Sequence, residues 1–224
     1  METGKVYALL GANGAGKTTL FNLLSGFLRP DAGDIYIHGK PTKGKLPYAV
    51  NRLGISRTFQ DLRLATKLTV KENIKLAMPG NPSDRWHTAL LPAAFFRKTE
   101  EEMERKAAQI LQQCFLTDVQ DSLAGEISYG QQKLTTIGCC IANDAKLLLL
   151  DEPVAGINPE YRDKMTILLS QLKQQGKSIL LIEHNTEFIK SVADQVFFLH
   201  NGKLATFANI SALKADPLVM EAYT

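Results

Sequence analysis

A glycine-rich segment near the start of the chain has the spacing of a phosphate-binding loop. Residues 11–18 read Gly-Ala-Asn-Gly-Ala-Gly-Lys-Thr and fit the pattern Gly-x-x-x-x-Gly-Lys-Ser/Thr at every defined position. Glycines let the backbone wrap closely around an anion, and the amides of the loop and the following helix direct positive charge at it. We expect Lys17 to reach the β- and γ-phosphates of a nucleoside triphosphate and the Thr18 hydroxyl to bind Mg²⁺. The predicted binding residues of this loop are Gly11, Asn13, Gly14, Ala15, Gly16, Lys17, Thr18 and Thr19.

Two acids follow a run of four leucines at residues 147–150, which predicts a fully buried strand. Ligands of open α/β sheets gather at the carboxyl ends of the strands, where Asp151 and Glu152 then lie. We expect Asp151 to hold Mg²⁺ through water and Glu152 to orient or deprotonate an attacking water. The alternative interpretation is that both acids cap a helix. This interpretation is weaker for a pair of acids beside a phosphate loop than for either acid alone.

Two further side chains are expected at the same edge of the sheet. His184 follows the predicted strand at residues 178–182, from which it can reach a γ-phosphate and act with Glu152 in catalysis. Gln60 follows Thr58 and Phe59, where its amide can ligate Mg²⁺ or sense the γ-phosphate. A structural role is the alternative for the histidine.

A second anion site is predicted far along the chain, at residues 128–131, which read Ser-Tyr-Gly-Gln. A helix N-terminus with a serine hydroxyl and a glycine amide binds anions. The phosphate loop of the same chain has no need of this second site, so Ser128, Tyr129, Gly130 and Gln131 are expected to bind the ATP held by another chain. The sequence therefore predicts an ATPase that works as a head-to-tail dimer with composite sites.

Apolar strands alternate with helices along the chain, which predicts an α/β fold with a mostly parallel sheet covered by helices. Residues 62–142 are predicted to form an inserted helical lobe, whose clearest helix begins at Thr99 with Glu102 completing a capping box. Its apolar stripe fits core packing or a docking face. The expected strands are residues 6–10, 34–38, 147–150 and 178–182, with a hairpin of residues 197–199 and 203–207 around Asn201 and Gly202. The expected helices in the remainder are residues 17–25 and a helix capped by Asn158 and Pro159 that runs to Gly176.

Size and composition restrict the function further. The chain of 224 residues has 45% apolar residues and a net charge of +3, which fits one α/β domain and gives no indication of a nucleic-acid partner. No signal peptide and no apolar run of membrane-spanning length is found, so a membrane role is expected to come through a partner. Residues 40–75 carry a basic excess that can face anionic lipid or solvent equally well. Cys114, Cys139 and Cys140 are expected to be buried free thiols in a reducing cytoplasm.

Taken together, these segments resemble the ATP-binding subunits of ABC transporters, and most of all the cassettes of branched-chain amino-acid importers. The resemblance implies a P-loop NTPase fold with a RecA-like core at about residues 1–61 and 143–224, an antiparallel β subdomain, and a helical subdomain at about residues 62–142. The segments that carry the resemblance are residues 55–60, 68–74, 127–132, 151–159 and 216–223.

The same resemblance implies partners and a location. The cofactors are ATP and Mg²⁺, and the partners are a second ATP-binding subunit, the same or homologous, and integral-membrane permease subunits. A coupling helix of the permease is expected to contact Gln60 and its neighbourhood, and an extracytoplasmic solute-binding protein acts indirectly. Residues 155–158 are expected to join the two ATP sites across the dimer. The resemblance places the chain at the cytoplasmic face of the inner membrane, peripherally bound.

The sequence departs from the common pattern of the family at three places. Tyr129 stands where most members have a small residue and Asn158 where many have aspartate, and both changes are common in the importer subgroup. Members of the family also begin further upstream, with an aromatic residue that stacks on adenine. Tyr7 is the only aromatic residue before Gly11 here, and it lies inside a predicted core strand. An N-terminal strand and the stacking contact are therefore expected to be missing.

Three other functions compete with the importer. The lipopolysaccharide-transport ATPases share the pattern of residues 155–159, although Tyr129 favours the importer. A soluble ABC ATPase that acts on ribosomes or DNA is expected to have two cassettes or long coiled coils. A regulatory module that senses ATP without turnover is opposed by the intact set of Lys17, Asp151, Glu152 and His184.

Overall fold

A computed structural model describes residues 1–80, 97–216 and 219 and divides the chain into two compact units. The first unit comprises Met1–Gln60, Ala145–Ala155 and Met165–Thr224, and the second comprises Asp61–Asp144 and Gly156–Lys164. Within the described residues, no helix combines the length and the apolar character needed to cross a bilayer.

The first unit is built on a six-stranded sheet with the order β4-β5-β6-β1-β7-β8. All neighbours in this order are parallel except β7 and β8, which confirms the predicted α/β fold with a mostly parallel sheet. In register, Asp151 lies opposite Ile182, and Ile182 lies opposite Leu9 on its other side. Consequently the segments that follow β1, β5 and β6 emerge at one edge of the sheet. The strands are β1 (Val6–Leu10), β4 (Ile55–Arg57), β5 (Leu147–Asp151), β6 (Ser178–Ile182), β7 (Gln195–His200) and β8 (Lys203–Phe207).

The predicted hairpin is confirmed, because β7 and β8 pair antiparallel around Asn201 and Gly202. Both turn residues have positive φ, 46° and 73°, as a tight hairpin turn requires. A separate antiparallel pair consists of β2 (Tyr36–Ile37) and β3 (Lys40–Pro41). The predicted strand at residues 34–38 is therefore shorter than expected, since His38 and Gly39 at φ 48° and 74° already turn the chain.

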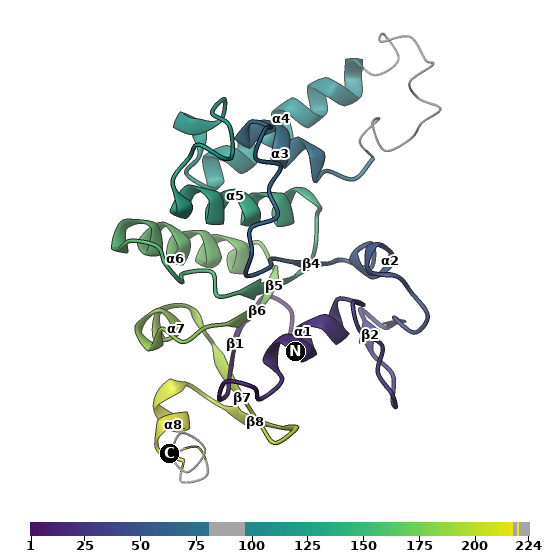
Figure 1. Ribbon diagram of the computed structural model, residues 1–224, viewed down its shortest axis with the longest axis vertical. Helices are drawn as coiled ribbons and strands as arrows, with labels where there is room; N and C mark the ends of the chain where they lie inside the picture. The colour runs from purple at the N-terminus through teal and green to yellow at the C-terminus, as the bar shows by residue number, and fades with distance from the viewer. Residues whose placement is uncertain (81–96, 217–218, 220–224) are drawn as a thin grey trace. The chain divides into compact units, whose positions relative to one another are not determined.

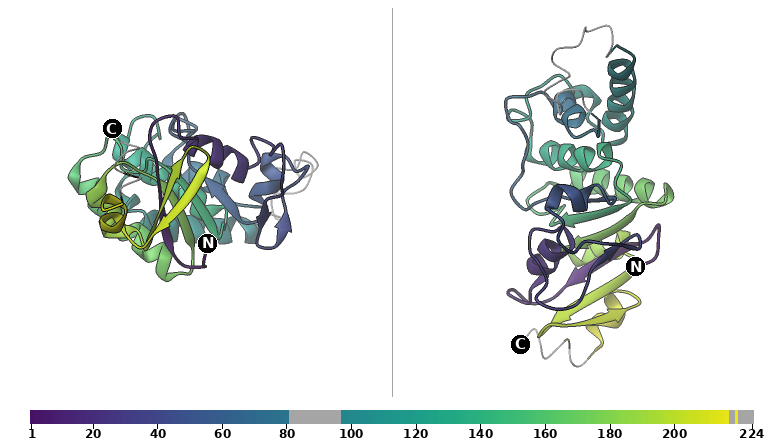
Figure 2. Two further views of the ribbon diagram at one scale, coloured as in Figure 1. Left: turned by 90° about the horizontal axis from the view of Figure 1, so that it is seen from below. Right: turned by 90° about the vertical axis from the view of Figure 1, so that its right-hand side faces the viewer.

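One face of the sheet packs against α1 (Lys17–Leu24), whose Phe21 is fully buried. Alternate strand residues meet it there, because side chains of a strand point to opposite faces in turn. In Figure 1, α1 and α7 (Thr186–Val192) lie on opposite sides of these strands, and the right-hand view of Figure 2 shows the strands in succession up to the yellow β8. The strand residues in the core with Phe21 are Tyr7, Leu9, Ile55, Leu149, Leu180, Ile182 and Leu199.

A local side-chain cap explains where one further helix begins. The helix predicted from Asn158 and Pro159 is α6 (Pro159–Gln174), and the Asn158 side chain accepts a hydrogen bond from the Tyr161 amide at 3.0 Å. This helix spans the boundary between the two units. The first unit also contains the short helices α2 (Pro47–Asn51) and α8 (Ile210–Lys214).

The second unit is helical, and its helices lie against one another (Figure 2). The predicted stripe of the long helix is buried, with Met103, Ala107, Ile110, Leu111 and Cys114 at 8% exposure or less, which favours core packing over a docking face. The helices are α3 (Val70–Leu76), α4 (Arg97–Gln113), the 3₁₀ turn η4 (Thr117–Val119) and α5 (Tyr129–Ala142).

One predicted helix start is wrong. Helix α4 already includes Arg97, so Thr99 lies inside the helix, where it cannot act as a cap for the first amides. The same Thr-x-x-Glu spacing forms a true capping box at Thr69 and Glu72, which opens α3 with both reciprocal hydrogen bonds. The pattern alone cannot tell a cap from an interior turn.

The three cysteines lie in the second unit as free thiols. Cys114 and Cys140 are buried, Cys139 is half-buried, and burial raises the pKa of Cys139 to about 12. Burial likewise raises the pKa of Cys114. The prediction of buried free thiols is confirmed for Cys114 and Cys140 and holds in part for Cys139.

Candidate functional site

The edge of the sheet at which β1, β5 and β6 end carries a cavity of about 360 Å³. It belongs entirely to the first unit. Segments far apart in the sequence meet here because the parallel register aligns the carboxyl ends of their strands. The residues that line it are Asn13, Gly14, Gly16, Lys17, Thr18, Thr19, Gln60, Asp151, Glu152, Ile182 and His184.

The predicted phosphate loop connects β1 directly to α1. Gly14 and Gly16 have φ of 80° and 99°, a conformation that side chains with Cβ atoms rarely adopt, and Gly16 is the N-cap of α1. The Lys17 ammonium lies over the loop and donates to the carbonyls of Gly11 at 2.7 Å and Ala12 at 3.0 Å. Burial lowers the pKa of Lys17, and the nearby carboxylates of Glu152 and Asp151 oppose that effect.

Asp151 ends β5 and is held by the neighbouring strand end. Its amide donates to the Thr58 hydroxyl oxygen at 3.0 Å, and the Thr58 amide donates to Leu149 at 2.9 Å. The Arg57 guanidinium lies 3.6 Å from the Asp151 carboxylate, and both side chains are nearly buried. The sequence reading did not assign these roles to Arg57 and Thr58. The signal was available, because polar residues in a strand beside a buried one require partners.

Glu152 has φ of 49°, which is uncommon for a residue with a side chain. Its amide donates to Ile182 at 2.9 Å, so the strained turn is fixed by β6. Because of this turn, the Glu152 side chain points in a different direction from that of Asp151. Its carboxylate lies 3.7 Å from Nε2 of His184, and both groups are partly exposed in the cavity. Glu152 and His184 therefore form a pair that can hold a water.

Glu183 organises the loops on which this pair depends. It is 3% exposed, and one carboxylate oxygen accepts a hydrogen bond from the Val154 amide at 3.0 Å. The other oxygen accepts from the amides of His184 at 2.8 Å and Asn185 at 3.1 Å. One buried carboxylate thus ties the loop after Glu152 to the loop that carries His184. The sequence analysis assigned no role to Glu183.

The predicted second anion site lies in the second unit, and its residues do not line the cavity. Ser128 caps α5 as predicted, with its hydroxyl accepting from the Gln131 amide at 3.4 Å and its own amide donating to the Gln131 side chain at 2.9 Å. Ser128 is exposed, and the Tyr129 ring is 44% exposed. Gly130 is required by a close approach, since a Cβ there would lie 2.5 Å from the ring of Tyr161.

The donors of the cavity fit a hard divalent cation that keeps several waters. The described residues contain no cluster of three or more His, Cys, Asp or Glu side chains that could form a closed metal cage. They offer instead one carboxylate at Asp151, the Thr18 hydroxyl and the Gln60 amide around the cavity. Mg²⁺ bound together with phosphates uses such a sparse set of protein oxygens.

Tyr7 cannot stack on a nucleotide base. Its ring is 1% exposed and stacks on Phe197, with centroids 5.0 Å apart, and its hydroxyl accepts from the Glu2 amide at 2.7 Å. Two of the predicted loop residues, Gly11 and Ala15, belong to the loop but do not line the cavity.

Comparison with known proteins gives consistent matches. The family model described as "ABC transporter" matches residues 1–155. The "Probable branched-chain amino acid transport ATP-binding protein LivG" of Archaeoglobus fulgidus is 36% identical over 223 residues, which cover 100% of this chain and 86% of that protein. The "High-affinity branched-chain amino acid transport ATP-binding protein BraF" of Pseudomonas aeruginosa is 33% identical over 224 residues, covering 100% and 88%.

The fold matches solved structures as well. The crystal structure of a nucleotide-free ATP-binding cassette from an ABC transporter superposes with a TM-score of 0.82 at 33% identity, covering 100% of this chain and 89% of that chain. The ADP conformation of an ATP-binding cassette superposes with a TM-score of 0.81 at 34% identity, covering 99% and 88%.

Proposed function

The chain belongs to the ABC transporter family of ATP-binding cassette ATPases, and we propose that it powers an importer of branched-chain amino acids. The proposed ATPase activity rests on the observation that the phosphate loop, Asp151, Glu152, His184 and Gln60 line one and the same cavity. The choice of substrate rests on relatives whose names specify branched-chain amino-acid transport.

The residues of the cavity divide the work of ATP hydrolysis among them. The loop amides and Lys17 bind the phosphates, and Thr18 and Asp151 would hold Mg²⁺, which would neutralise charge on the phosphates. Glu152 accepts the proton of a water that attacks the γ-phosphorus, and the bond from that phosphorus to the bridging oxygen breaks to give ADP and phosphate. His184, whose Nε2 lies 3.7 Å from the Glu152 carboxylate, orients the water against the γ-phosphate.

We assign Ser128, Tyr129, Gly130 and Gln131 to the ATP bound by a second cassette. Support comes from the exposure of Ser128 at the N-terminus of α5 and from the position of these residues outside the cavity of the first unit. The N-terminal amides of a helix of 14 residues favour an anion. Each chain then supplies the phosphate loop of one site and the capped helix of the other.

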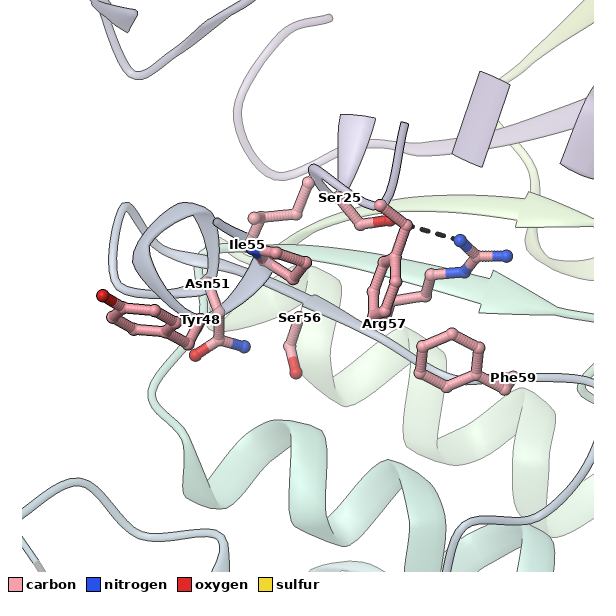
Figure 3. A pocket seen from close by; sticks show the side chains of 9 residues that line it. Ser25, Tyr48, Asn51, Ile55, Ser56, Arg57 and Phe59 are labelled. Atoms are coloured by element: carbon pink, nitrogen blue, oxygen red, sulfur yellow. Dashed lines mark hydrogen bonds between the residues drawn. The ribbon is translucent and has the colours of Figure 1, made fainter. Parts of the chain in front are cut away.

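The membrane partner is proposed to dock beside Gln60. A second hollow of about 290 Å³ is lined by β4, Phe27, Tyr48 and Phe59, and Figure 3 shows Tyr48 and Phe59 at its two ends. Phe27 is 48% and Tyr48 is 62% exposed, which suits contact with an apolar helix of a permease subunit. The segment from Ile55 to Gln60 lines both this hollow and the cavity, so it can report docking to the ATP site. Docking there places the chain at the cytoplasmic face of the inner membrane.

A transport assay tests the proposal. The chain is co-purified with the permease subunits and reconstituted in proteoliposomes that are supplied with the solute-binding protein, ATP and radiolabelled leucine. We expect uptake that depends on ATP and falls by roughly 10²–10⁴-fold in Glu152→Gln, since general-base catalysis contributes about that factor. Glu187→Gln, a change of an exposed acid on α7, is the matched control and keeps normal uptake.

Two results separate the parts of the proposal. Normal ATP hydrolysis by Glu152→Gln would remove Glu152 from its catalytic role. Vigorous ATP hydrolysis by the wild-type complex, without uptake of any branched-chain amino acid, would keep the ATPase and refute the substrate. Stimulation by lipopolysaccharide instead would favour the competing transport ATPase.

A further inference from the structure

A buried arginine lies between the ATP cavity and the hollow beside Phe59. Arg57 is the last residue of β4, and its side chain is 5% exposed. One guanidinium nitrogen, Nη1, donates to Oδ1 of Asn22 at 2.6 Å and to Oγ of Ser25 at 3.2 Å, the latter drawn in Figure 3. The other, Nη2, lies 3.6 Å from Oδ2 of Asp151. The guanidinium therefore spans from α1 to the carboxylate at the end of β5.

Two aromatic rings fix the guanidinium from its sides. Its central carbon lies 5.4 Å from the ring centre of Phe21 and 4.8 Å from that of Phe59. Phe59 in turn lines the hollow and contacts the Phe27 ring edge to face, with centroids 5.4 Å apart. A planar, delocalised cation suits this position, because it can stack and donate several hydrogen bonds at once. A lysine has the same charge but lacks the planar set of donors.

We propose that Arg57 is a positioning residue for Asp151, which it holds by one carboxylate oxygen so that the other faces the metal site. The proposal rests on the proposed function in taking Asp151 as a ligand of Mg²⁺. The anchor at Asn22 fixes the guanidinium to the helix that follows the phosphate loop. The position of Asp151 is thereby tied to the loop and, through Phe59, to the surface assigned to the permease.

Positioning and simple charge make opposite predictions for metal binding. A fixed positive charge near Asp151 repels a divalent cation, so on charge alone its removal tightens metal binding. If Arg57 instead orients the carboxylate, its removal weakens metal binding, as the loss of groups that orient metal ligands does in other sites. The sign of the change therefore decides between the two.

The test measures Mn²⁺ affinity in the presence of ADP, from the electron paramagnetic resonance signal of free Mn²⁺. We expect Arg57→Met to weaken Mn²⁺ binding by about 10–100-fold, the usual effect of removing such a partner. ADP affinity in EDTA stays unchanged. Asn22→Ala, which keeps the charge and removes its anchor, weakens Mn²⁺ binding in the same direction, and Arg57→Lys lies between Arg57→Met and the wild type. Circular dichroism melts establish which variants are folded.

Controls make the outcomes distinct. Arg52→Met removes an exposed arginine of the same unit and leaves Mn²⁺ affinity unchanged. Equal or tighter Mn²⁺ binding in Arg57→Met would overturn the positioning role. If Arg57→Met does not fold, wild-type affinity in both Asn22→Ala and Arg57→Lys would overturn it equally. Asp151→Asn tests the underlying function, because unchanged Mn²⁺ affinity there would remove Asp151 as a ligand, whatever Arg57 does.

Discussion

Replacing Glu183 by glutamine tests whether one buried carboxylate holds the catalytic loops together. Gln has a single acceptor oxygen, so it can keep the bonds to His184 and Asn185 only by directing its NH₂ group at the Val154 amide. A hydrogen bond to a charged group contributes about 1.5–3 kcal/mol, and a neutral one about 0.5–1.5 kcal/mol. One bond is lost and two become neutral, while the lower cost of burying a neutral group offsets part of this.

We therefore expect Glu183→Gln to lower the free energy of unfolding by about 2–4 kcal/mol, which corresponds to a fall in melting temperature on the order of 10 °C. Urea unfolding followed by circular dichroism measures the stability. Because Val154 follows Glu152 closely and His184 adjoins Glu183, the kcat for ATP should fall roughly tenfold or more, since small misplacements of reacting groups are costly. The KM for ATP should change little, as the phosphate loop is untouched.

The matched control is Glu187→Gln, the same chemical change on the following helix. Glu187 is exposed and forms an ion pair with Lys190 at 3.1 Å, and such surface pairs contribute little to stability. A loss of stability below about 1 kcal/mol in Glu183→Gln, together with wild-type kcat, would refute the reasoning, because three amides cannot lose a charged acceptor at that small cost.

Three further predictions concern the second unit. Ser128→Arg should abolish ATP hydrolysis and leave nucleotide binding intact, as measured by turnover and fluorescent-nucleotide titration, and full turnover would contradict composite sites. Gly130→Ala should destabilise the chain by about 1–3 kcal/mol, because its Cβ would lie 2.5 Å from Tyr161; an unchanged urea midpoint would contradict this. The raised pKa of Cys139 stabilises the folded chain below pH 9, and this contribution is lost as pH rises from about 9 towards about 12. Cys139→Ala should lose that part of the pH dependence, which pH-dependent urea unfolding measures.

Much of the site could be predicted because the chemistry follows short stretches of sequence. The phosphate loop lies between its strand and helix as expected, and Asp151 ends a buried strand. The Ser128 cap and the hairpin at Asn201 depend on residues within a few positions of one another. Local hydrogen bonds and backbone preferences act over that range, so the sequence carries their signal directly.

Local signals failed where the same pattern fits two situations. Thr99 and Thr69 both precede a glutamate by three residues, and only Thr69 caps a helix. The residues at 34–38 alternate like a strand, but the turn at His38 shortens it to Tyr36–Ile37. The segment at residues 216–223 that contributed to the family resemblance lies almost wholly outside the described residues.

The sequence by itself determined the phosphate loop, the pair of acids, the capped helix and the family to which the chain belongs. Only the tertiary structure decided that Glu183 joins two loops and that Arg57 reaches Asp151. The physical reason is the parallel register, which places Asp151 beside Ile182 and Arg57 beside Leu149 although these residues are far apart in the chain. Buried polar groups must find partners, but which partner each one finds depends on strands that pair across long sequence separations.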